Sequence, residues 1–434
     1  MSATVVLSIA EIARIICTLL EDDKKSLFSL VFCNKAVSET ALDVLWAKLD
    51  SMKPLMPFVP GGLRRASFDI EISIETFLRL PCCPAEEWQT FDKYAQRVKV
   101  LRSADPRCAW MDGTRLTYSK LAALRARDGV DLFPNLRSIV CFLSEPGLRD
   151  EKLLPSSLRS LTSFVMGYEV EVEGHTNTLL QLAHTPLLEQ FNLRGLFRSL
   201  VTDHVQPLKL AYLREVDLTR AFISSRDFQC LCAVLCESPI TVLSIHLRHP
   251  LVDWRPALSV FPSLRQLTFC GDPSIAQSFL ERLPKSTLAD FTIEHEDVGV
   301  YLSPYESLLG VLHEKFANSL KSIYLNFGQQ PMDIHPHYFL LRSLVALCPL
   351  VDAGLEELRY SMPLHMPTLP EELRPVLDPS SWPKLRVFSF STKSPRLSHR
   401  DLEETMRHWA PIFASFQPVR LGSSSFLGED DANE

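Results

Sequence analysis

Cysteine is the residue type in this chain whose spacing comes closest to a metal site. Three of its 11 cysteines fall within seven residues, at Cys230, Cys232 and Cys236. Zinc sites combine such cysteines with a second pair of Cys or His ligands at a set spacing, and no second pair follows here. The segment instead has the spacing of an amphipathic helix, in which cysteine behaves as a small hydrophobic residue. We therefore expect no metal site in the chain.

The sequence also lacks the common motifs of catalysis. It contains no G-x-S-x-G, no P-loop, no dinucleotide-binding glycine pattern and no H-E-x-x-H. His335 and His337 lie in DIHPHY, which has no carboxylate at ligand spacing, and we expect a loop that leads into a helix there. We expect a protein that is not an enzyme and binds no cofactor. An enzyme would need titratable residues clustered in a pocket of the folded chain.

The charge and hydropathy of the chain exclude several classes of partner. Its 434 residues include 45 basic and 52 acidic side chains, a net charge of −7. An acidic protein lacks the positive surface of non-specific nucleic-acid binding, so we expect no nucleic-acid partner. No run of about 18 apolar residues occurs, and Glu11 and Arg14 interrupt the apolar N-terminus. We expect no membrane partner and no secretion signal. The cysteines should be reduced thiols, which fits the cytoplasm, the nucleus or both.

A short phrase recurs along the chain and indicates its architecture. DLFPNLRSIVCF begins at Asp131, SVFPSLRQLTFCG at Ser259 and SSWPKLRVFSFST at Ser380. Each contains a leucine, an apolar residue three positions later and another two positions after that, which is the alternation of a strand with one buried face. A weaker copy lies at Val98/Leu101. Ten clearer copies, about 28 residues apart on average, are Leu136/Ile139/Cys141, Leu158/Leu161/Ser163, Leu188/Phe191/Leu193, Leu213/Val216/Leu218, Ile240/Leu243/Ile245, Leu264/Leu267/Phe269, Leu288/Phe291/Ile293, Leu320/Ile323/Leu325, Leu355/Leu358/Tyr360 and Leu385/Phe388/Phe390.

Stretches with helical spacing lie between the copies. They are TNTLLQLAHT, SSRDFQCLCAVLCESP, SIAQSFLERLPKS, YESLLGVLHEKFANS and HPHYFLLRSLVALCP. One short strand and one helix at a period in the twenties is typical of the leucine-rich repeat. Stacked units of this kind bury a continuous core. The sequence predicts an α/β fold, a curved solenoid with parallel strands on its concave face and helices outside. The alternative is an ordinary α/β domain whose strands look alike.

The predicted organisation has five parts. A small helical module at 1–58 precedes a helical connector and N-terminal cap at 59–130. The irregular array of about ten strand–helix units covers 131–395. At 396–418, Leu402, Met406, Trp409 and Phe413 fall on one helical face, which predicts a closing helix. The acidic tail at 419–434 is expected to be disordered.

The helical module at 1–58 resembles one known family of small helical modules. The segment IAEIARIICTLLEDDKKSLFSLVFCNKAVSETALDVLW has two helical stretches, with Ser38 and Thr40 as possible caps within the second. It departs from the family pattern at Ala10, where a proline is usual, and at Val37, where an aromatic residue is usual. The matching positions are Glu11-Ile12, Ile15-Ile16, Leu19, Asp22-Asp23, Leu27, Leu30-Val31, Cys33, Ala41-Leu42 and Leu45-Trp46. The whole chain is similar to F-box proteins with irregular leucine-rich repeats from mushroom-forming basidiomycete fungi.

This resemblance implies a substrate receptor of a Skp–cullin–F-box ubiquitin ligase. The F-box would dock on a Skp-type adaptor, and through it on a cullin, while the solenoid holds a target protein. The receptor itself does no chemistry and raises the effective concentration of the target. The alternative is a non-enzymatic interaction scaffold whose degenerate F-box no longer binds a ligase. The residues expected to contact the adaptor are Ile9, Ile12, Ile15, Leu30 and Val31.

The polar residues between the apolar strand positions are the candidates for target binding. Strand alternation places them on the concave face of a solenoid. They are polar and mixed in sign, as expected for protein recognition, although a solvated face without a ligand would have the same composition. The candidates are Asn192, Arg194, Glu215, Asp217, Gln266, Thr268, Asp290, Tyr324 and Arg359.

Overall fold

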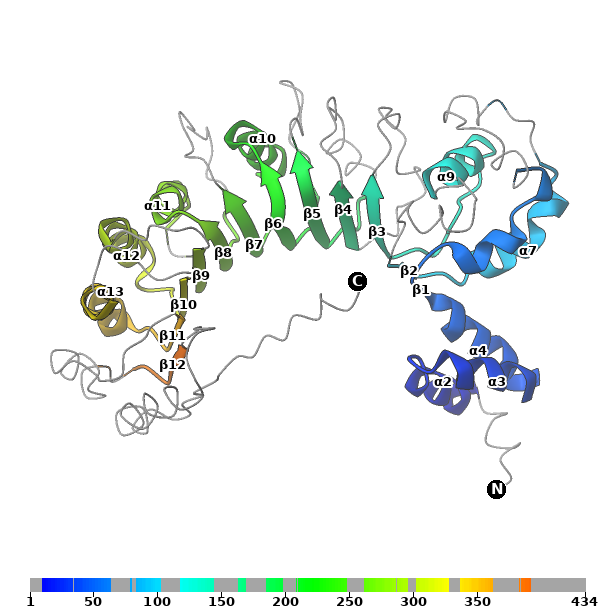
Figure 1. Ribbon diagram of the computed structural model, residues 1–434, viewed down its shortest axis with the longest axis horizontal. Helices are drawn as coiled ribbons and strands as arrows, with labels where there is room; N and C mark the ends of the chain where they lie inside the picture. Colours follow the sequence, from blue (N-terminus) through cyan, green and yellow to red (C-terminus); the bar gives the residue numbers. More distant parts are fainter. Residues whose placement is uncertain are drawn as a thin grey trace. The chain divides into compact units, whose positions relative to one another are not determined.

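A computed structural model (Figure 1) describes fifteen segments of the chain, some of which are single residues. It divides into two compact units, Met1–Leu213 and Arg214–Glu434. Their boundary falls inside the range 131–395, which the sequence predicts as one array. The described residues are 10–33, 35–63, 79, 83–102, 118–143, 163–168, 185–197, 208, 210–247, 261–285, 287–295, 302–327, 336–361, 382 and 384–391.

Three helices come first among the described residues of the first unit: α2 (Ala10–Leu19), α3 (Lys24–Cys33) and α4 (Lys35–Ala47). Asp23 stands before α3 and accepts hydrogen bonds from the backbone N–H and the hydroxyl of Ser26, which fixes the start of the helix. These bonds lower the pKa of the Asp23 carboxyl. The expected caps within the second stretch are wrong, because α4 already begins at Lys35, before Ser38 and Thr40.

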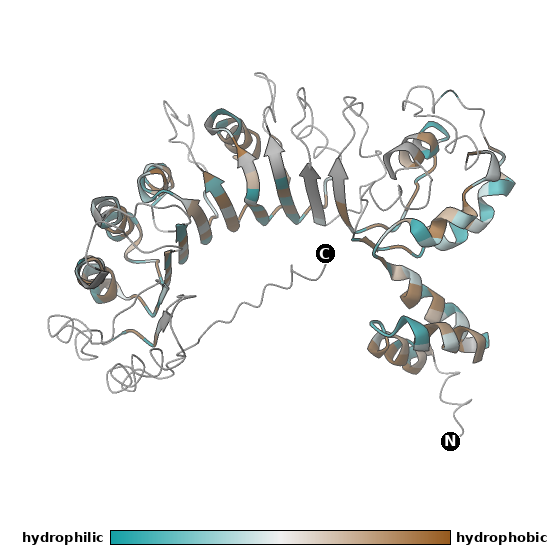
Figure 2. Ribbon diagram, viewed as in Figure 1, coloured by the Kyte–Doolittle hydropathy of each residue, from teal (hydrophilic) through white to brown (hydrophobic). Residues whose placement is uncertain are grey.

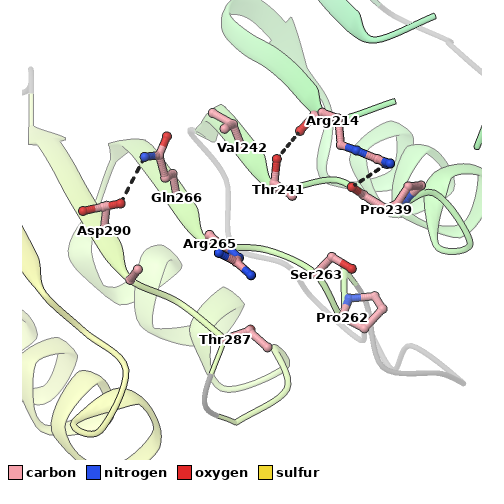
Figure 3. A pocket seen from close by; sticks show the side chains of 11 residues that line it. Arg214, Pro239, Thr241, Val242, Pro262, Ser263, Arg265, Gln266, Thr287 and Asp290 are labelled. Carbon is pink, nitrogen blue, oxygen red and sulfur yellow. Dashed lines mark hydrogen bonds between the residues drawn. The ribbon is translucent and has the colours of Figure 1, made fainter. Parts of the chain in front are cut away.

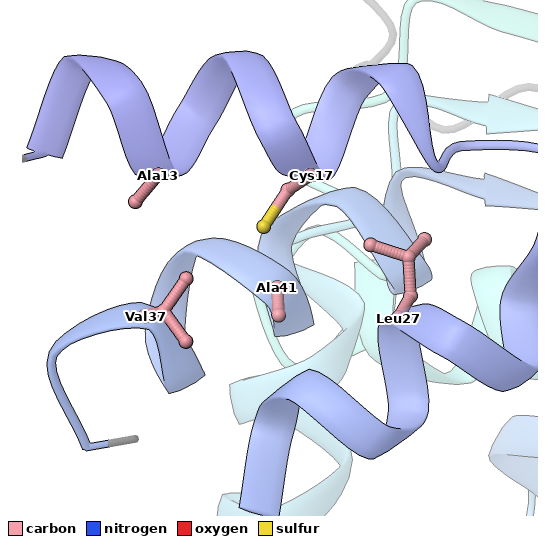
Figure 4. Close-up of a cluster of buried hydrophobic side chains, with 5 residues drawn as sticks. All are labelled: Ala13, Cys17, Leu27, Val37 and Ala41. Atoms are coloured by element: carbon pink, nitrogen blue, oxygen red, sulfur yellow. The ribbon is translucent and has the colours of Figure 1, made fainter. Parts of the chain in front are cut away.

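A core of small side chains holds these helices together, because α2 and α3 both pack against α4. In Figure 4, Ala13 and Cys17 of α2 point toward Val37 and Ala41 of α4, and all four are at most 1% exposed. Leu27 of α3 completes the cluster. Small residues let helix axes approach closely, but they bury little apolar area.

Aromatic rings and one arginine attach α4 to the segment that follows it. The Trp46 ring lies 4.6 Å from that of Tyr94 in α7 (Ala85–Ala95), between their centroids. Tyr94 in turn stacks on Phe58 of the short helix η1 (Lys53–Phe58), with 4.9 Å between the ring centroids. The guanidinium of Arg97 is mostly buried and forms ion pairs with Glu39 and Asp43 of α4.

A buried arginine joins α7 to α9 (Tyr118–Arg127). Both carboxylate oxygens of Asp92 accept hydrogen bonds from Arg125, at 2.8 and 2.9 Å. The same guanidinium lies 4.5 Å from the ring centroid of Trp88, a cation–π contact. Because Arg125 is 4% exposed, this pairing is needed to keep a charge in the interior.

Five strands of the first unit pair in chain order, all parallel: β1 (Lys48–Leu49), β2 (Val100–Leu101), β3 (Ser138–Leu143), β4 (Ser163–Tyr168) and β5 (Gln190–Phe197). The weak copy at Val98/Leu101 is a strand, and β1 precedes it inside the predicted helical module. The copy at Leu158/Leu161/Ser163 is wrong by three residues. Phe164 and Met166 occupy the register of Ile139 and Cys141, because only that alignment continues the alternating apolar positions.

The described part of the second unit contains seven parallel strands, again paired in chain order: β6 (Glu215–Ile223), β7 (Val242–Leu247), β8 (Gln266–Gly271), β9 (Asp290–His295), β10 (Ser322–Phe327), β11 (Glu357–Ser361) and β12 (Val387–Ser391). All seven predicted copies in this unit are in register with one another. Gly271 has a φ of 136°, and a Cβ there would collide with the carbonyl oxygen of Leu247.

Helices connect several of these strands and lie on one side of them (Figure 1). They are α10 (Ser225–Leu235), α11 (Pro273–Leu280), α12 (Leu302–Phe316) and α13 (Pro336–Ala353). All four were predicted from apolar spacing and are confirmed. Ser224 and Asp272 cap α10 and α11, each accepting a backbone N–H with its side chain.

The core of the second unit lies between its strands and these helices. Figure 2 shows apolar and polar residues alternating along the strands. Large aromatic side chains fill the space, as in the contact of Tyr305 with Phe327 at a centroid distance of 4.8 Å. Phe339 packs edge-on against both rings.

The structure confirms a mixed α/β protein with a large parallel sheet. The predicted helix in TNTLLQLAHT, the closing helix at 396–418 and the tail at 419–434 lie largely or wholly outside the described residues. No helix in the described part of the chain is both long and apolar enough to cross a bilayer.

Candidate functional site

The polar face of the second unit is organised as rows that run across its strands. Parallel pairing brings equivalent positions side by side, about 4.8 Å from strand to strand. The first row is Glu215, Val242, Gln266, Asp290, Ser322, Glu357 and Val387. The second row is Asp217, Ser244, Thr268, Thr292, Tyr324, Arg359 and Ser389. On each strand, the residue between the two rows is buried.

Seven of the nine predicted target-binding residues lie in these two rows. They are Glu215, Asp217, Gln266, Thr268, Asp290, Tyr324 and Arg359. The other two, Asn192 and Arg194, lie on β5 of the first unit, where Arg194 Nε donates to Asn192 Oδ1 at 3.2 Å. The prediction missed Ser244, Thr292 and Ser389 of the second row, although the same alternation identifies them.

Many of the charged groups in these rows are paired with a neighbour. Gln266 donates its amide N–H to Asp290 at 3.0 Å, from one strand to the next. Arg359 donates to Glu357 at 2.6 Å within one strand. Such pairs stiffen the surface and leave it with both signs of charge.

Tyr324 is the large side chain of the second row. Its partial burial raises the pKa of the phenol. A half-buried tyrosine combines an apolar ring with a polar tip, which suits a protein interface. The rows therefore offer hydroxyl, amide, carboxylate and guanidinium groups around one aromatic side chain.

The helical module of the first unit has a different surface. Its exposed side chains include large apolar ones at helical i, i+4 spacing. Ile15 and Leu19 on α2 are 60% and 81% exposed, and Phe28 and Phe32 on α3 are 55% and 73% exposed. The two phenylalanine rings touch edge to face, with 4.9 Å between their centroids. Single exposed apolar residues are common, but two such pairs on one small module make a candidate binding surface.

The five residues predicted to contact the adaptor differ in their exposure to solvent. Ile15 is exposed and Ile12 is half-buried. Leu30 and Val31 are half-buried against the core of the module, where they stabilise the module itself. Ile9 lies outside the described residues. Leu19, Phe28 and Phe32 are better placed for contact, and their i, i+4 spacing was visible in the sequence.

Strongly shifted titratable groups do not gather in a cavity of the described residues. Burial raises the pKa of Cys232, Tyr305 and Tyr360, and all three side chains lie within the core of the second unit. No three His, Cys, Asp or Glu side chains among the described residues are arranged to hold a metal ion. The raised pKa values follow from burial in a packed core.

The sequence matches no protein-family model and no curated protein.

Proposed function

We propose that this protein is the substrate-recognition subunit of a Skp–cullin–F-box ubiquitin ligase. The module at 1–58 is the F-box and binds a Skp-type adaptor, which links it to a cullin. The strand–helix units form a leucine-rich-repeat solenoid whose concave polar rows bind a target protein. The subunit catalyses nothing itself and acts in the cytoplasm or nucleus.

The observation that carries this proposal is the pair of exposed apolar surfaces on the helical module. Ile15, Leu19, Phe28 and Phe32 are large side chains that α4 does not cover. Leaving such groups in water costs about 25 cal/mol per Å² relative to burying them in an interface. A protein partner that covers them recovers this free energy. The resemblance to an F-box points to a Skp-type adaptor as that partner.

The polar rows of the second unit support the second half of the proposal. They combine donors and acceptors of both signs with the half-buried Tyr324, and they extend across seven strands. An extended surface of this composition binds a protein segment through many moderate contacts, in the manner of repeat proteins.

Co-purification with a Skp-type adaptor tests the proposal. We expect the full chain to carry the adaptor through size-exclusion chromatography. The double variant Leu19→Ser/Phe32→Ser should lose at least about 90% of the bound adaptor, since interface anchors dominate affinity. Val345→Ser, at a 48% exposed apolar residue of α13, is the matched control and should retain binding.

Two results would contradict this function. The first is a folded, monomeric full chain that does not bind the adaptor. The second is adaptor binding that the double variant leaves intact, which would place the contact elsewhere. In the first case the protein would be a leucine-rich-repeat scaffold with a degenerate F-box.

A further inference from the structure

Basic residues recur along the edge of the second unit where its strands begin. The edge row is defined here as the residue immediately before each strand, and it comprises Arg214, Thr241, Arg265, Ala289, Lys321, Glu356 and Arg386. Backbone hydrogen bonds join it: the carbonyl of each member accepts the N–H of the next, at 2.7–2.9 Å. The positions are therefore held in fixed register along the edge.

The four basic residues of the edge row precede every second strand. Arg214 precedes β6, Arg265 precedes β8, Lys321 precedes β10 and Arg386 precedes β12. Adjacent strands are about 4.8 Å apart, so successive cations start from backbone positions about 9.6 Å apart. Glu356 is the one carboxylate of the row, and it lies between two of the cations, 2.9 Å from Lys321 and 3.7 Å from Arg386.

Two hollows lie along this edge. The larger has a volume of about 1040 Å³. Figure 3 shows Arg265 of this hollow between Ser263, Gln266 and Thr287, with Arg214 beyond Thr241. The Arg265 guanidinium makes no hydrogen bond or ion pair with the described part of the chain. Among the described residues that line this hollow, Asp290 is the only one with a carboxylate, and Gln266 donates a hydrogen bond to it.

The smaller hollow, of about 450 Å³, adds to the positive charge of the edge. Lys321, Lys384 and Arg386 line it, and Glu356 supplies the single carboxylate among its described lining residues. Both arginine and lysine are able to bind carboxylate or phosphate groups here, and arginine can do so in bidentate fashion. The protein as a whole is acidic, so this concentration of cations departs from its average composition.

We propose that the edge row binds an extended acidic protein segment with a carboxylate at every third residue. A polyproline-II helix has three residues per turn and rises about 9.3 Å per turn, so its i and i+3 side chains lie on one face at nearly the spacing of the cations. The acidic groups of such a segment would each meet one cation. This inference rests on the proposed function, because the segment would be a second contact for a target of that receptor. Peptide binding does not require the adaptor, so failure of this proposal and failure of the proposed function can be told apart.

Peptide binding to the full chain tests the proposal. The probe is a fluorescently labelled, end-capped peptide of four Glu-Pro-Pro repeats, and its control has the same composition with four consecutive glutamates followed by eight prolines. We expect fluorescence anisotropy at about 50 mM salt to give a Kd at least fivefold lower for the repeat peptide. Raising the salt to about 300 mM should weaken both, because the contacts are between exposed charges.

Charge-reversal variants locate the site. Arg265→Glu/Arg386→Glu should weaken binding of the repeat peptide by at least tenfold. Neither change should disturb folding, since the Arg265 guanidinium makes no hydrogen bond or ion pair with the described residues and Arg386 is 79% exposed. An unchanged melting temperature would verify this. Arg220→Glu, at an exposed position near the other end of β6, is the matched control and should change Kd by less than twofold.

Three outcomes would overturn the proposal. Equal affinity for the repeat and block peptides would show that spacing plays no part. Undiminished binding by the folded double variant would place the site elsewhere. A single-stranded DNA 20-mer that binds more tightly than the repeat peptide, and loses affinity in the same variant, would make the edge a nucleic-acid site.

Discussion

The helical module at the start of the first unit and the sheet of the second unit bury their apolar residues in different ways. The module packs small side chains such as Ala13 and Ala41 inside and leaves Phe28 and Phe32 in solvent. Among its described residues, the second unit packs most of its large side chains inside, with Tyr305 and Phe291 each 1% exposed. Its core therefore uses large aromatic rings, whereas the module leaves two phenylalanine rings available for a partner.

The two regions also use lysine differently. In the module, Lys24 pairs with Asp50 at 2.6 Å, and both side chains are more than half exposed. In the second unit, Lys315 donates to the carbonyl oxygens of Leu280, Glu281 and Leu283 at 2.9, 2.8 and 2.5 Å, which closes the C-terminal end of α11. Screening by water weakens the first contact much more than the second.

Removing one buried ring should produce the largest difference between the regions. Phe291→Ala in β9 should lower the free energy of unfolding by about 3–5 kcal/mol, because it leaves a cavity in a close-packed core. Phe32→Ala in α3 should change it by less than about 0.5 kcal/mol, since the ring is already in water. Urea unfolding of both variants measures the contrast. Equal losses would mean that the module also depends on its large side chains for folding.

The contact of Lys315 should have an intermediate effect. Lys315→Met keeps the length of the side chain but removes a donor from three carbonyl groups, and should cost about 1–3 kcal/mol. Lys285→Met, at an exposed lysine of the neighbouring loop, is the matched control and should cost less than about 0.5 kcal/mol. Chemical denaturation of the two variants provides the comparison. Similar losses of stability for both variants would show that water forms equally good hydrogen bonds with the three carbonyl groups.

The strands were predicted well because their evidence is local and repeated. Each copy carries its own apolar alternation, and seven consecutive copies from Leu213 to Phe390 are in register. The copy near Leu158 failed because LRSLTSF contains two leucines three residues apart, and only pairing with β3 selects between the two alignments. Pairing is a long-range property that a short segment does not encode.

The surfaces were predicted less completely, because exposure depends on which helices meet. The apolar stripe of α2 was evident, but only the packing of α4 decides that Ala13 is buried and Ile15 is exposed. The edge row was missed for a different reason. The basic residue after the first leucine of several copies, as in NLRSI, SLRQL and KLRVF, was visible in the sequence. Its meaning depends on the parallel register that aligns these residues.

The ion pair of the module should have the smallest effect, and it should depend on pH. The hydrogen bond from Lys24 lowers the pKa of Asp50 below its ordinary value of 3.8. A lowered carboxyl pKa adds stability above the unfolded-state pKa, and this is lost as the pH falls through the folded-state pKa. Asp50→Asn should therefore lower the stability of the module by at most about 0.5 kcal/mol at pH 7.

Thermal melts of the parent and Asp50→Asn chains at several pH values measure this contribution. The difference in melting temperature should stay constant between pH 7 and about pH 5, and should shrink as the pH falls below 3.8. Salt at about 1 M should also remove it at pH 7, since both partners are exposed. A difference that survives both acid and salt would mean that Asp50 acts through packing, and that the module is held by the same kind of contact as the second unit.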